Sequence, residues 1–238
     1  MSLARPSAET YEIGPGAFAL PHGLLFLART GTLIAADVHL GYEDVIGGAL
    51  PLWSTASIAR IVAAAVEICN ARELVLLGDV VHASAMSEGA ARTVRAALDG
   101  LRARCPVVAI AGNHEGRSRG RALLGETVER LDRDGWMLLH GDKPPLEPAR
   151  CIVGHLHPSL RLGGDASVPV LLAGETLIVA PALTPYSPGL DVRSAECARA
   201  VRAFGARVDR MVAVACGEDR VYPFGSVGNL RAPARSRR

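Results

Sequence analysis

The stretch LVLLGDVVHAS, residues 74–84, contains an apolar run that stops abruptly at residues of another kind. The four apolar residues from Leu74 to Leu77 have the length and composition of a buried β-strand. Gly78 and Asp79 follow directly, and His82 comes three positions later. A carboxylate at the end of a buried strand is costly unless it is paired or holds a cation. The junction therefore predicts a polar site at the edge of a β-sheet.

Strand-like and helix-like segments alternate on both sides of this stretch. The expected strands are residues 33–36, 74–77, 107–111, 136–139 and 151–153, and the expected helices are residues 54–70, 88–104 and 121–132. This alternation predicts βαβ units and a central, partly parallel sheet. After residue 157 the expected elements are β segments joined by glycine-containing turns, at residues 168–172, 176–180, 211–216 and 220–222. They predict a second, more antiparallel sheet packed on the first.

The length and composition favour one domain. The chain has 238 residues, of which 49% are hydrophobic, enough for one large α/β domain with a substantial core. We find no internal repeat or linker, so we expect a single domain over residues 1–238. Its end, near residues 231–238, reads RAPARSRR and is expected to be a short, disordered basic tail.

Other features of the sequence predict a cytoplasmic protein. There is no uninterrupted apolar run of 18 residues, and the first residues lack the apolar region of a signal peptide. The five cysteines are scattered without a CxxC pair, which fits reduced packing residues better than a disulfide framework.

The basic residues are almost all arginine, because Lys143 is the only lysine. Arginine suits bidentate recognition of phosphate, although a compositional bias of the source genome explains the same pattern. The formal net charge of +2 is too small to indicate nucleic-acid binding by itself.

Five of the expected strands end in clusters of polar residues, and six of the seven histidines lie in them. The clusters are Asp37-Val38-His39, Gly78-Asp79 with His82, Gly112-Asn113-His114-Glu115, His140-Gly141-Asp142 and Gly154-His155-Leu156-His157. Ligands of open α/β sheets bind outside the carboxyl ends of the strands. We therefore expect the five clusters to meet at one site.

The spacing within the clusters fits metal binding. Asp37 and His39 are two residues apart, as are His155 and His157, so in extended backbone each pair would project to the same side. A glycine before several of the polar residues would let the backbone turn tightly or approach another strand. Aspartate, asparagine and histidine without cysteine suit Mn²⁺, Fe or Zn²⁺ better than a structural thiolate zinc site.

The polar side chains are numerous enough for two ions that share a carboxylate. Two metal ions about 3.5–4 Å apart can hold a bridging hydroxide and position a phosphoryl group for in-line attack. Each feature alone has a simpler interpretation, such as packing for His-x-His or an ordinary turn for Gly-Asp. Only the five clusters together predict a binuclear metal centre.

The clusters resemble the motifs of the calcineurin-like metallophosphoesterases. The family pattern DxH, GD, GNH[DE], H, GHxH is matched by DVH at 37–39, GD at 78–79, GNHE at 112–115, His140, and GHLH at 154–157. The resemblance implies an αββα two-sheet sandwich, with mixed sheets flanked by helices. It also implies hydrolysis of phosphoesters with two divalent ions, of which Mn²⁺ suits the ligands best.

The resemblance assigns a role to each matched residue. The ligands of one ion would be Asp37, His39 and His157. Those of the other would be Asn113, His140 and His155, with Asp79 bridging the two ions. His114 would not be a ligand; it would contact the scissile phosphate and protonate the leaving oxygen.

His82 is a departure from one part of the family. The phosphoprotein phosphatases carry GDxxD, where the second aspartate orients the histidine of GNH, whereas this chain has GDVVH. A histidine cannot supply the same negative charge, and the GDxxH form is similar to that of recombination-repair nucleases in the superfamily. The alternative is that His82 only packs or makes a local hydrogen bond.

Longer segments resemble one group within the superfamily, the ligase-associated DNA damage response phosphoesterases. These segments include HGLLFLARTGTLIAADVHLGYE, GHLHPSLRL and IVAPALTPYSPG. This resemblance implies a DNA endonuclease in repair, associated with a DNA ligase, an exonuclease and a helicase. Three arginines lie beside GNHE: Arg117, Arg119 and Arg121. They would either contact backbone phosphates or be solvated loop residues.

Two other functions are consistent with the sequence. One is a small-molecule phosphatase or cyclic-nucleotide phosphodiesterase, although no sugar or base pocket can be identified from the residues. The other is a non-catalytic module that binds a partner in a repair complex. The complete set of metal ligands argues against the second, because buried aspartate and histidine are costly without an ion.

Overall fold

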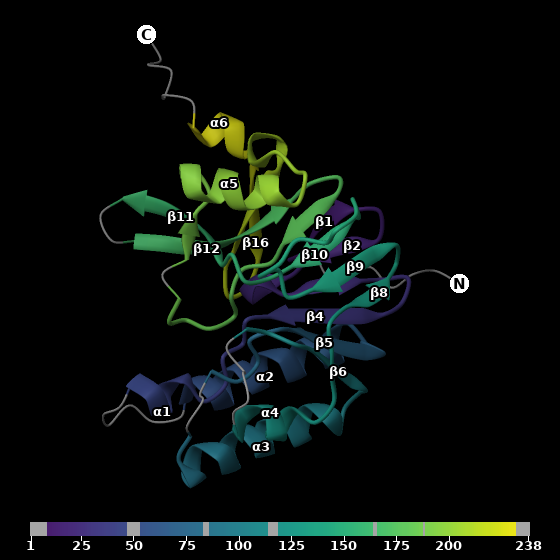
Figure 1. Ribbon diagram of the computed structural model, residues 1–238, viewed down its shortest axis with the longest axis vertical. Coiled ribbons are helices and arrows are strands. Elements are labelled where there is room, and N and C mark those ends of the chain that lie inside the picture. The colour runs from purple at the N-terminus through teal and green to yellow at the C-terminus, as the bar shows by residue number, and fades with distance from the viewer. Residues whose placement is uncertain are drawn as a thin grey trace.

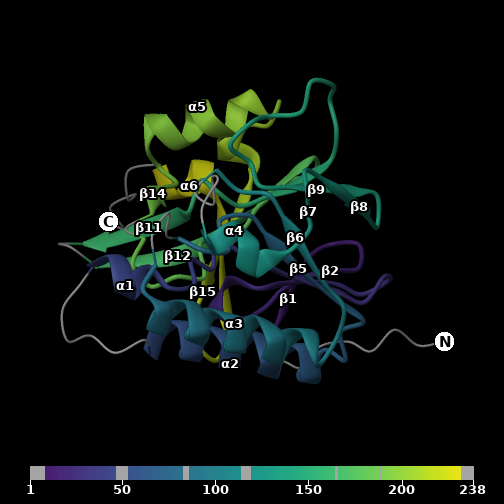
Figure 2. The same cartoon turned by 60° about the horizontal axis from the view of Figure 1, so that its bottom comes forward.

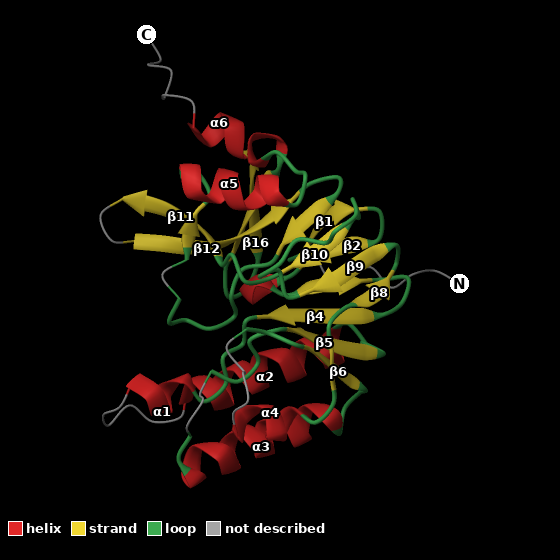
Figure 3. Cartoon of the chain, in the orientation of Figure 1, coloured by secondary structure: helices red, strands yellow, loops and turns green. Residues whose placement is uncertain are grey.

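Two β-sheets lie face to face, and helices cover the outer face of each, in the computed structural model of the chain (Figure 1). The structure describes residues 9–46, 53–82, 86–113, 119–163, 166–187 and 189–231. The layers follow the order helix, sheet, sheet, helix, which confirms the predicted αββα sandwich (Figure 3).

The first sheet contains seven strands that neighbour one another in chain order. They are β1 (Tyr11–Gly14), β2 (Ala17–Ala19), β3 (Leu25–Leu27), β4 (Thr32–Ala36), β5 (Glu73–Leu77), β6 (Val107–Ile110) and β7 (Thr127–Val128). Strands β1 to β4 pair antiparallel, and β4 to β7 pair parallel. Three of these parallel strands, β4, β5 and β6, are followed by predicted polar clusters.

The second sheet contains nine strands. They are β8 (Leu131–Arg133), β9 (Trp136–Leu139), β10 (Cys151–Val153), β11 (Pro158–Gly163), β12 (Ala166–Ala173), β13 (Leu177–Val179), β14 (Leu190–Asp191), β15 (Val212–Cys216) and β16 (Val221–Ser226). Strands β9, β10 and β13 are parallel, whereas β12, β15 and β16 pair antiparallel. The C-terminal part of the chain therefore forms the more antiparallel region that was predicted.

Helices lie on both sides of the pair of sheets (Figure 2). The α-helices are α1 (Tyr42–Ile46), α2 (Trp53–Ile68), α3 (Glu88–Arg102), α4 (Arg119–Leu124), α5 (Ala195–Ala203) and α6 (Val227–Arg231), and the 3₁₀ helices are η1 (Pro21–Gly23) and η2 (Val208–Arg210). Helices α2 and α3 cover the first sheet, and α5 and α6 cover the second. Within the described ranges, no helix has both the length and the apolar character needed to cross a membrane.

Strand β5 shows why the apolar run LVLL is continuous rather than alternating. Leu74 and Leu76 pack with the apolar faces of α2 and α3, whereas Val75 and Leu77 lie in the core between the two sheets. All four side chains are almost completely buried. A strand covered on both faces reads as an unbroken apolar run, and this places its polar end, at Asp79, inside the molecule.

The helix predicted over residues 121–132 is wrong in its second half. Helix α4 ends at Leu124, and Gly125 follows with a positive φ of 78°. A glycine in this conformation commonly ends a helix. The next residues form β7, which extends the first sheet, and β8, which begins the second. Pairing with existing sheets thus overrides the helical pattern of this segment.

Helix α5 lies in a region that was predicted to contain only β segments. Ser194 caps it by accepting a hydrogen bond from the backbone N–H of Cys197, at 3.0 Å. Cys197 and Val201 are buried against the second sheet, four residues apart on one helix face. A serine cap followed by this spacing is the signal that the sequence contained.

The predicted disordered tail includes Arg231, which the structure places in a helix. Arg231 belongs to α6, and its guanidinium donates a hydrogen bond to the Asp209 carboxylate at 2.6 Å. Residues 232–238 lie outside the described residues, so disorder there stays a prediction. The single-domain assignment for residues 1–238 also stays a prediction.

All five cysteines are free, and four of them are buried. Burial raises the pKa of Cys69 to about 11 and that of Cys216 to about 12. Thiols with raised pKa values are poor nucleophiles, so the cysteines contribute to packing, as expected.

Candidate metal centre

The predicted polar clusters converge where the carboxyl ends of parallel strands from both sheets meet. Asp37 follows β4, Gly78-Asp79 follows β5 and Asn113 comes shortly after β6, all in the first sheet. From the second sheet, His140 follows β9, and Gly154-His155 follows β10. The site therefore draws its side chains from two sheets that face each other.

Asp37, His39 and His157 form one group whose possible ligand atoms all lie within 4.8 Å of one another. Asp37 is completely buried and His39 nearly so. Nε2 of His157 lies 3.3 Å from Oδ1 of Asp37. The other oxygen of Asp37 accepts a hydrogen bond of 2.8 Å from the backbone N–H of His155.

Asp79, His140 and His155 form a second group of the same kind. Nε2 of His140 lies 3.4 Å from Oδ2 of Asp79 and 3.1 Å from Nδ1 of His155. The amide oxygen of Asn113 lies 2.8 Å from the same nitrogen. The two groups are adjacent, because Nδ1 of His140 is 3.8 Å from Oδ1 of Asp37.

The backbone at five of these residues adopts a left-handed conformation. Of the eight non-glycine residues with positive φ in the described ranges, five belong to the two groups: Asp37, His39, Asp79, His155 and His157. The expectation that extended backbone would align the residues of each His-x-His or Asp-x-His pair is therefore wrong. Such conformations cost about 1–3 kcal/mol each and cluster at functional sites. Here they let the chain turn sharply at the end of each strand.

Three glycines permit the close approach of the two groups, as the sequence suggested. A Cβ atom at Gly78 would overlap the His140 ring, and one at Gly112 would overlap the backbone nitrogen of Asp79. A Cβ atom at Gly154 would overlap the carboxylate of Asp37. In each case a glycine beside one polar residue makes room for a residue from another strand.

The two groups fit divalent ions. Oδ1 of Asp37 and Nε2 of His157 are buried, and neither makes a hydrogen bond with a described residue. Buried polar atoms of this kind are rare unless a ligand satisfies them. Atoms that coordinate one ion at about 2.0–2.2 Å stand roughly 3.0–3.4 Å apart. The separations of 3.1, 3.3 and 3.4 Å within the two groups match this range.

Neighbouring side chains orient two of the histidines. Nδ1 of His157 lies 2.6 Å from the Ser187 hydroxyl, and Nδ1 of His39 lies 2.9 Å from Nδ1 of His82. A metal-binding histidine commonly donates its second ring N–H to such a partner, which fixes the tautomer. We therefore expect both histidines to offer Nε2 to an ion.

The ionisation of the histidines reflects burial and their neighbours. Burial lowers the pKa of His39 to about 4, although the carboxylates of Asp37 and Asp79 oppose the shift. Burial and the nearby His140 lower the pKa of His155. Burial also acts against protonation of His140, but its hydrogen bond with Asp79 and the nearby carboxylates raise its pKa overall. A neutral imidazole, favoured at His39 and His155, is the form that binds a metal ion.

Several predicted residues cannot be placed at the site. His114 and Arg117 lie outside the described residues, so their roles stay predictions. Arg119 and Arg121 lie in α4, but their side chains are not described. Their predicted contact with phosphate is therefore untested.

Four residues that line the site were not identified as site residues from the sequence. Tyr42 begins α1, and the others lie in the loop that follows β13: Thr184, Tyr186 and Ser187. The backbone N–H of Thr184 donates to the carbonyl oxygen of Asp37 at 3.4 Å, which holds this loop against the first group. The loop lies within the segment IVAPALTPYSPG, which resembles a segment of the repair phosphoesterases but carries no metal motif.

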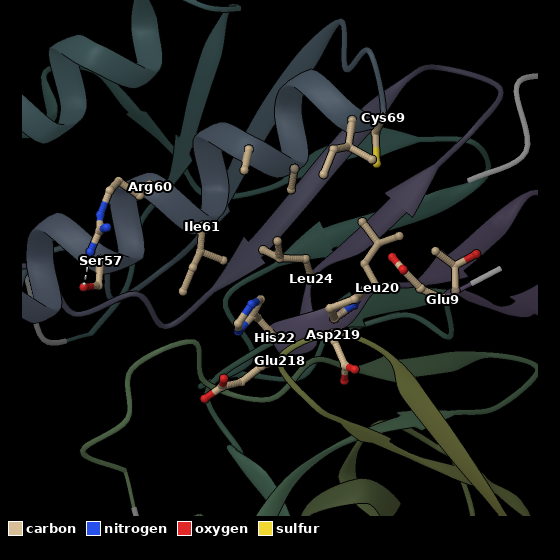
Figure 4. Close-up of a pocket in the computed structure, with 15 residues that line it drawn as sticks. Glu9, Leu20, His22, Leu24, Ser57, Arg60, Ile61, Cys69, Glu218 and Asp219 are labelled. Carbon is tan, nitrogen blue, oxygen red and sulfur yellow. Dashed lines mark hydrogen bonds between the residues drawn. The ribbon is translucent and has the colours of Figure 1, made fainter. Parts of the chain in front are cut away.

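The metal centre opens into several small cavities. Three cavities of about 170, 350 and 370 Å³ share His157 and Ser187 in their linings. A larger cavity, about 580 Å³, lies elsewhere, between α2 and the segment around Leu20 to Leu24 (Figure 4). Its floor is apolar, with Glu218 and Asp219 at its margin, and none of the candidate metal ligands lines it.

The protein is a two-sheet α/β sandwich whose paired aspartate and histidine groups, at the strand ends, could hold metal ions. The sequence model of the family described as calcineurin-like phosphoesterase matches residues 32–168, more than half of the chain. The chain belongs to this family and is a metal-dependent phosphoesterase. A comparison with curated protein sequences found no match.

Solved structures include proteins with a similar fold. Pseudomonas putida nuclease MPE superposes with a TM-score of 0.68 at 21% identity, covering 87% of this chain and 94% of that one. Yfce, a phosphoesterase from E. coli, gives a TM-score of 0.41 at 19% identity, covering 64% of this chain and 80% of that one. The first of these similarities supports the fold.

The metal-free protein is expected to lose stability as the pH falls from about 6.5 to about 4. The pKa of His39 is lowered from 6.5 to about 4, so in this range the unfolded chain binds a proton that the folded protein resists. The decrease in the free energy of unfolding attributable to His39 is at most about 3 kcal/mol, and no decrease is expected above pH ~6.5. His155, whose pKa is also lowered, contributes to the same loss of stability on acidification. His140, whose pKa is raised, opposes it.

Urea unfolding in the presence of a chelator, at neutral pH and near pH 4.5, measures this effect. The His39→Gln variant should lose less stability on acidification than the wild type, since glutamine does not titrate. Equal losses in the two proteins would show that His39 is not the group responsible.

Proposed function

We propose that the protein is a phosphodiesterase that uses two divalent metal ions, most suitably Mn²⁺, and that it acts on DNA as an endonuclease in repair. Fe and Zn²⁺ suit the same ligands. The observation that carries the choice of a diester is the arrangement of cavities around the metal centre.

The cavities that share His157 and Ser187 suit a phosphate that carries organic groups on more than one side. A phosphate held at the two metal groups would have one cavity beside Tyr42 and Tyr186 and another beside Pro158 and Pro181. A monoester has only one organic group to place. The separate cavities therefore favour a diester.

His82 supports the same choice. Its ring lies against His39, with a centroid separation of 4.8 Å, and it lines the cavity of about 170 Å³. If His39 donates its Nδ1 proton to His82, then His82 carries its own proton on Nε2 and is neutral. A neutral imidazole cannot favour a protonated acid near the leaving oxygen as the aspartate of GDxxD phosphatases would, and the GDxxH form resembles that of nucleases in the superfamily.

The candidate ligands divide between two ions in the way that the geometry groups them. Asp37, His39 and His157 would hold one ion, and Asn113, His140 and His155 the other. Asp79 would bridge them, since it belongs to the second group and its charge also acts on His39. Ions so held supply Lewis-acid chemistry and activate water for attack on phosphorus.

The residues of the chain perform the remaining steps. The buried carboxylates of Asp37 and Asp79 would fix the positions of the ions, and Ser187 would keep the His157 ring oriented. His114 is proposed to contact the phosphate and to give a proton to the leaving oxygen. Its pKa would need a compensating neighbour, since cations nearby favour the neutral imidazole.

DNA is the substrate to test first. The Pseudomonas putida protein that shares the fold is a nuclease. The longer sequence segments of this chain also resemble those of repair phosphoesterases. Association with a DNA ligase, an exonuclease and a helicase, and a cytoplasmic location, are further parts of this proposal. A small-molecule phosphatase or cyclic-nucleotide phosphodiesterase is the alternative within the same chemistry.

Purified protein with Mn²⁺ should hydrolyse a bis-aryl phosphodiester and nick plasmid DNA. Replacement of Asp79 by alanine should reduce both rates by more than about a hundredfold, because the loss of a metal-binding carboxylate removes several kcal/mol of transition-state stabilisation. Replacement of the exposed Asp132 by alanine is the matched control. Activity on phosphomonoesters alone would overturn the assignment as a diesterase.

Replacement of His82 by aspartate should shift preference towards monoesters by about tenfold or more, as judged by the ratio of kcat/KM for an aryl monoester and a bis-aryl diester. The added carboxylate can favour a protonated acid near the leaving oxygen. His82→Asn separates the effect of charge from that of size. An unchanged ratio in His82→Asp would leave His82 with a packing role only.

A further inference from the structure

The cavity of about 170 Å³ beside the metal centre is lined mainly by rings. Tyr42 and Tyr186 line it together with three histidines, His39, His82 and His157. The tyrosine ring centroids lie 5.2 Å apart, and the Tyr42 centroid lies 4.1 Å from that of His82, at 81° between the planes. These separations are typical of aromatic rings in contact. The rings thus form one continuous aromatic wall.

The aromatic wall is rigidly supported at Tyr42. The next residue, Glu43, is buried and accepts hydrogen bonds from the backbone and hydroxyl of Thr55, at 2.7 and 3.2 Å. Asp44 accepts two hydrogen bonds of 2.7 Å from Ser87, the residue that caps α3. The short helix α1 is therefore held against both α2 and α3, which fixes the position of the Tyr42 ring.

Tyr186 is held by the loop that follows β13. The backbone N–H of Leu183 donates to the carbonyl oxygen of Ala36 at 3.0 Å, and the Ser187 hydroxyl contacts His157. Tyr186 lies between these two attachments. Its ring is consequently positioned by residues that border the first metal group.

The described lining of this cavity suits an uncharged, flat group. It contains no lysine, arginine, aspartate or glutamate, so nothing in it would bind a second phosphate by charge. Hydroxyl groups of Thr184 and Ser187 can hydrogen-bond to the edge of a ring. The volume lies below the range of about 300–1,000 Å³ that encloses drug-sized ligands, so it fits one ring system rather than a whole nucleotide.

We propose that Tyr42 and Tyr186 form a binding subsite for one nucleobase of the substrate, next to the scissile phosphate. This inference rests on the proposed diesterase function and names the part of the substrate that the enzyme holds. Stacking on an aromatic ring tolerates every base, because each base has a π-face. The subsite would therefore provide affinity without reading sequence.

A base can enter this cavity only after it leaves its own stack. In a duplex this requires unpairing and unstacking, which costs a few kcal/mol, whereas a single strand offers unstacked bases readily. The subsite thus predicts preference for single-stranded or unpaired DNA over an intact duplex.

Calorimetry with Mn²⁺-loaded protein tests the subsite without requiring catalysis. Thymidine monophosphate and deoxyribose phosphate carry the same phosphate and differ by the base. Wild-type protein should bind the first at least about tenfold more tightly, which is within the range measured for one stacked base. In Tyr186→Leu most of this difference should disappear, whereas Tyr186→Phe should retain it because the ring remains.

Tyr222→Leu provides the matched control, because Tyr222 is exposed on β16 and is not among the residues that line the cavity. The proposal would be overturned if the affinity ratio of thymidine monophosphate to deoxyribose phosphate were equal in wild type and Tyr186→Leu. It would also be overturned if Tyr222→Leu reduced this ratio as much as Tyr186→Leu does. Calorimetry measures binding and not cleavage. Tighter binding of thymidine monophosphate by a protein that cleaves no diester would therefore refute the proposed function and still support the subsite.

Discussion

Two buried carboxylates, Asp37 and Asp79, lie where the ends of two facing sheets meet, and the local structure is arranged around them. Buried charges are costly unless paired or bound to cations. Glycines at positions 78, 112 and 154 leave space for the neighbouring side chains. Left-handed backbone at five residues turns the chain at the strand ends. These features make the centre well suited to divalent ions.

Much of this arrangement could be predicted from the sequence. The run from Leu74 to Leu77 predicted a buried strand, and the polar cluster after each expected strand predicted the edge where ligands gather. The glycines also indicated close approach of neighbouring strands. The conformation at Asp37 and His39 could not be predicted, because local spacing favours extended backbone there and only the completed site stabilises the left-handed turns.

Other features depended on contacts between distant parts of the chain. The segment after α4 has a helical pattern, yet it joins two existing sheets as β7 and β8. Tyr42 and Tyr186 are 144 positions apart in the sequence and carry no motif, but the loop after β13 brings their rings together. The metal motifs thus indicate the chemistry of the centre from the sequence alone. The aromatic wall, which we propose binds part of the substrate, can be identified only from the folded structure.

The chemistry proposed for this protein requires the two groups to hold two divalent ions. Titration of metal-free protein with Mn²⁺, followed by calorimetry and by elemental analysis of the dialysed complex, counts the ions directly. We expect two ions per chain in the wild type and fewer in Asp37→Ala, with unchanged circular dichroism. A wild type that binds no ion, or an Asp37→Ala variant that still binds two with the same affinity, would refute a two-ion centre at these residues.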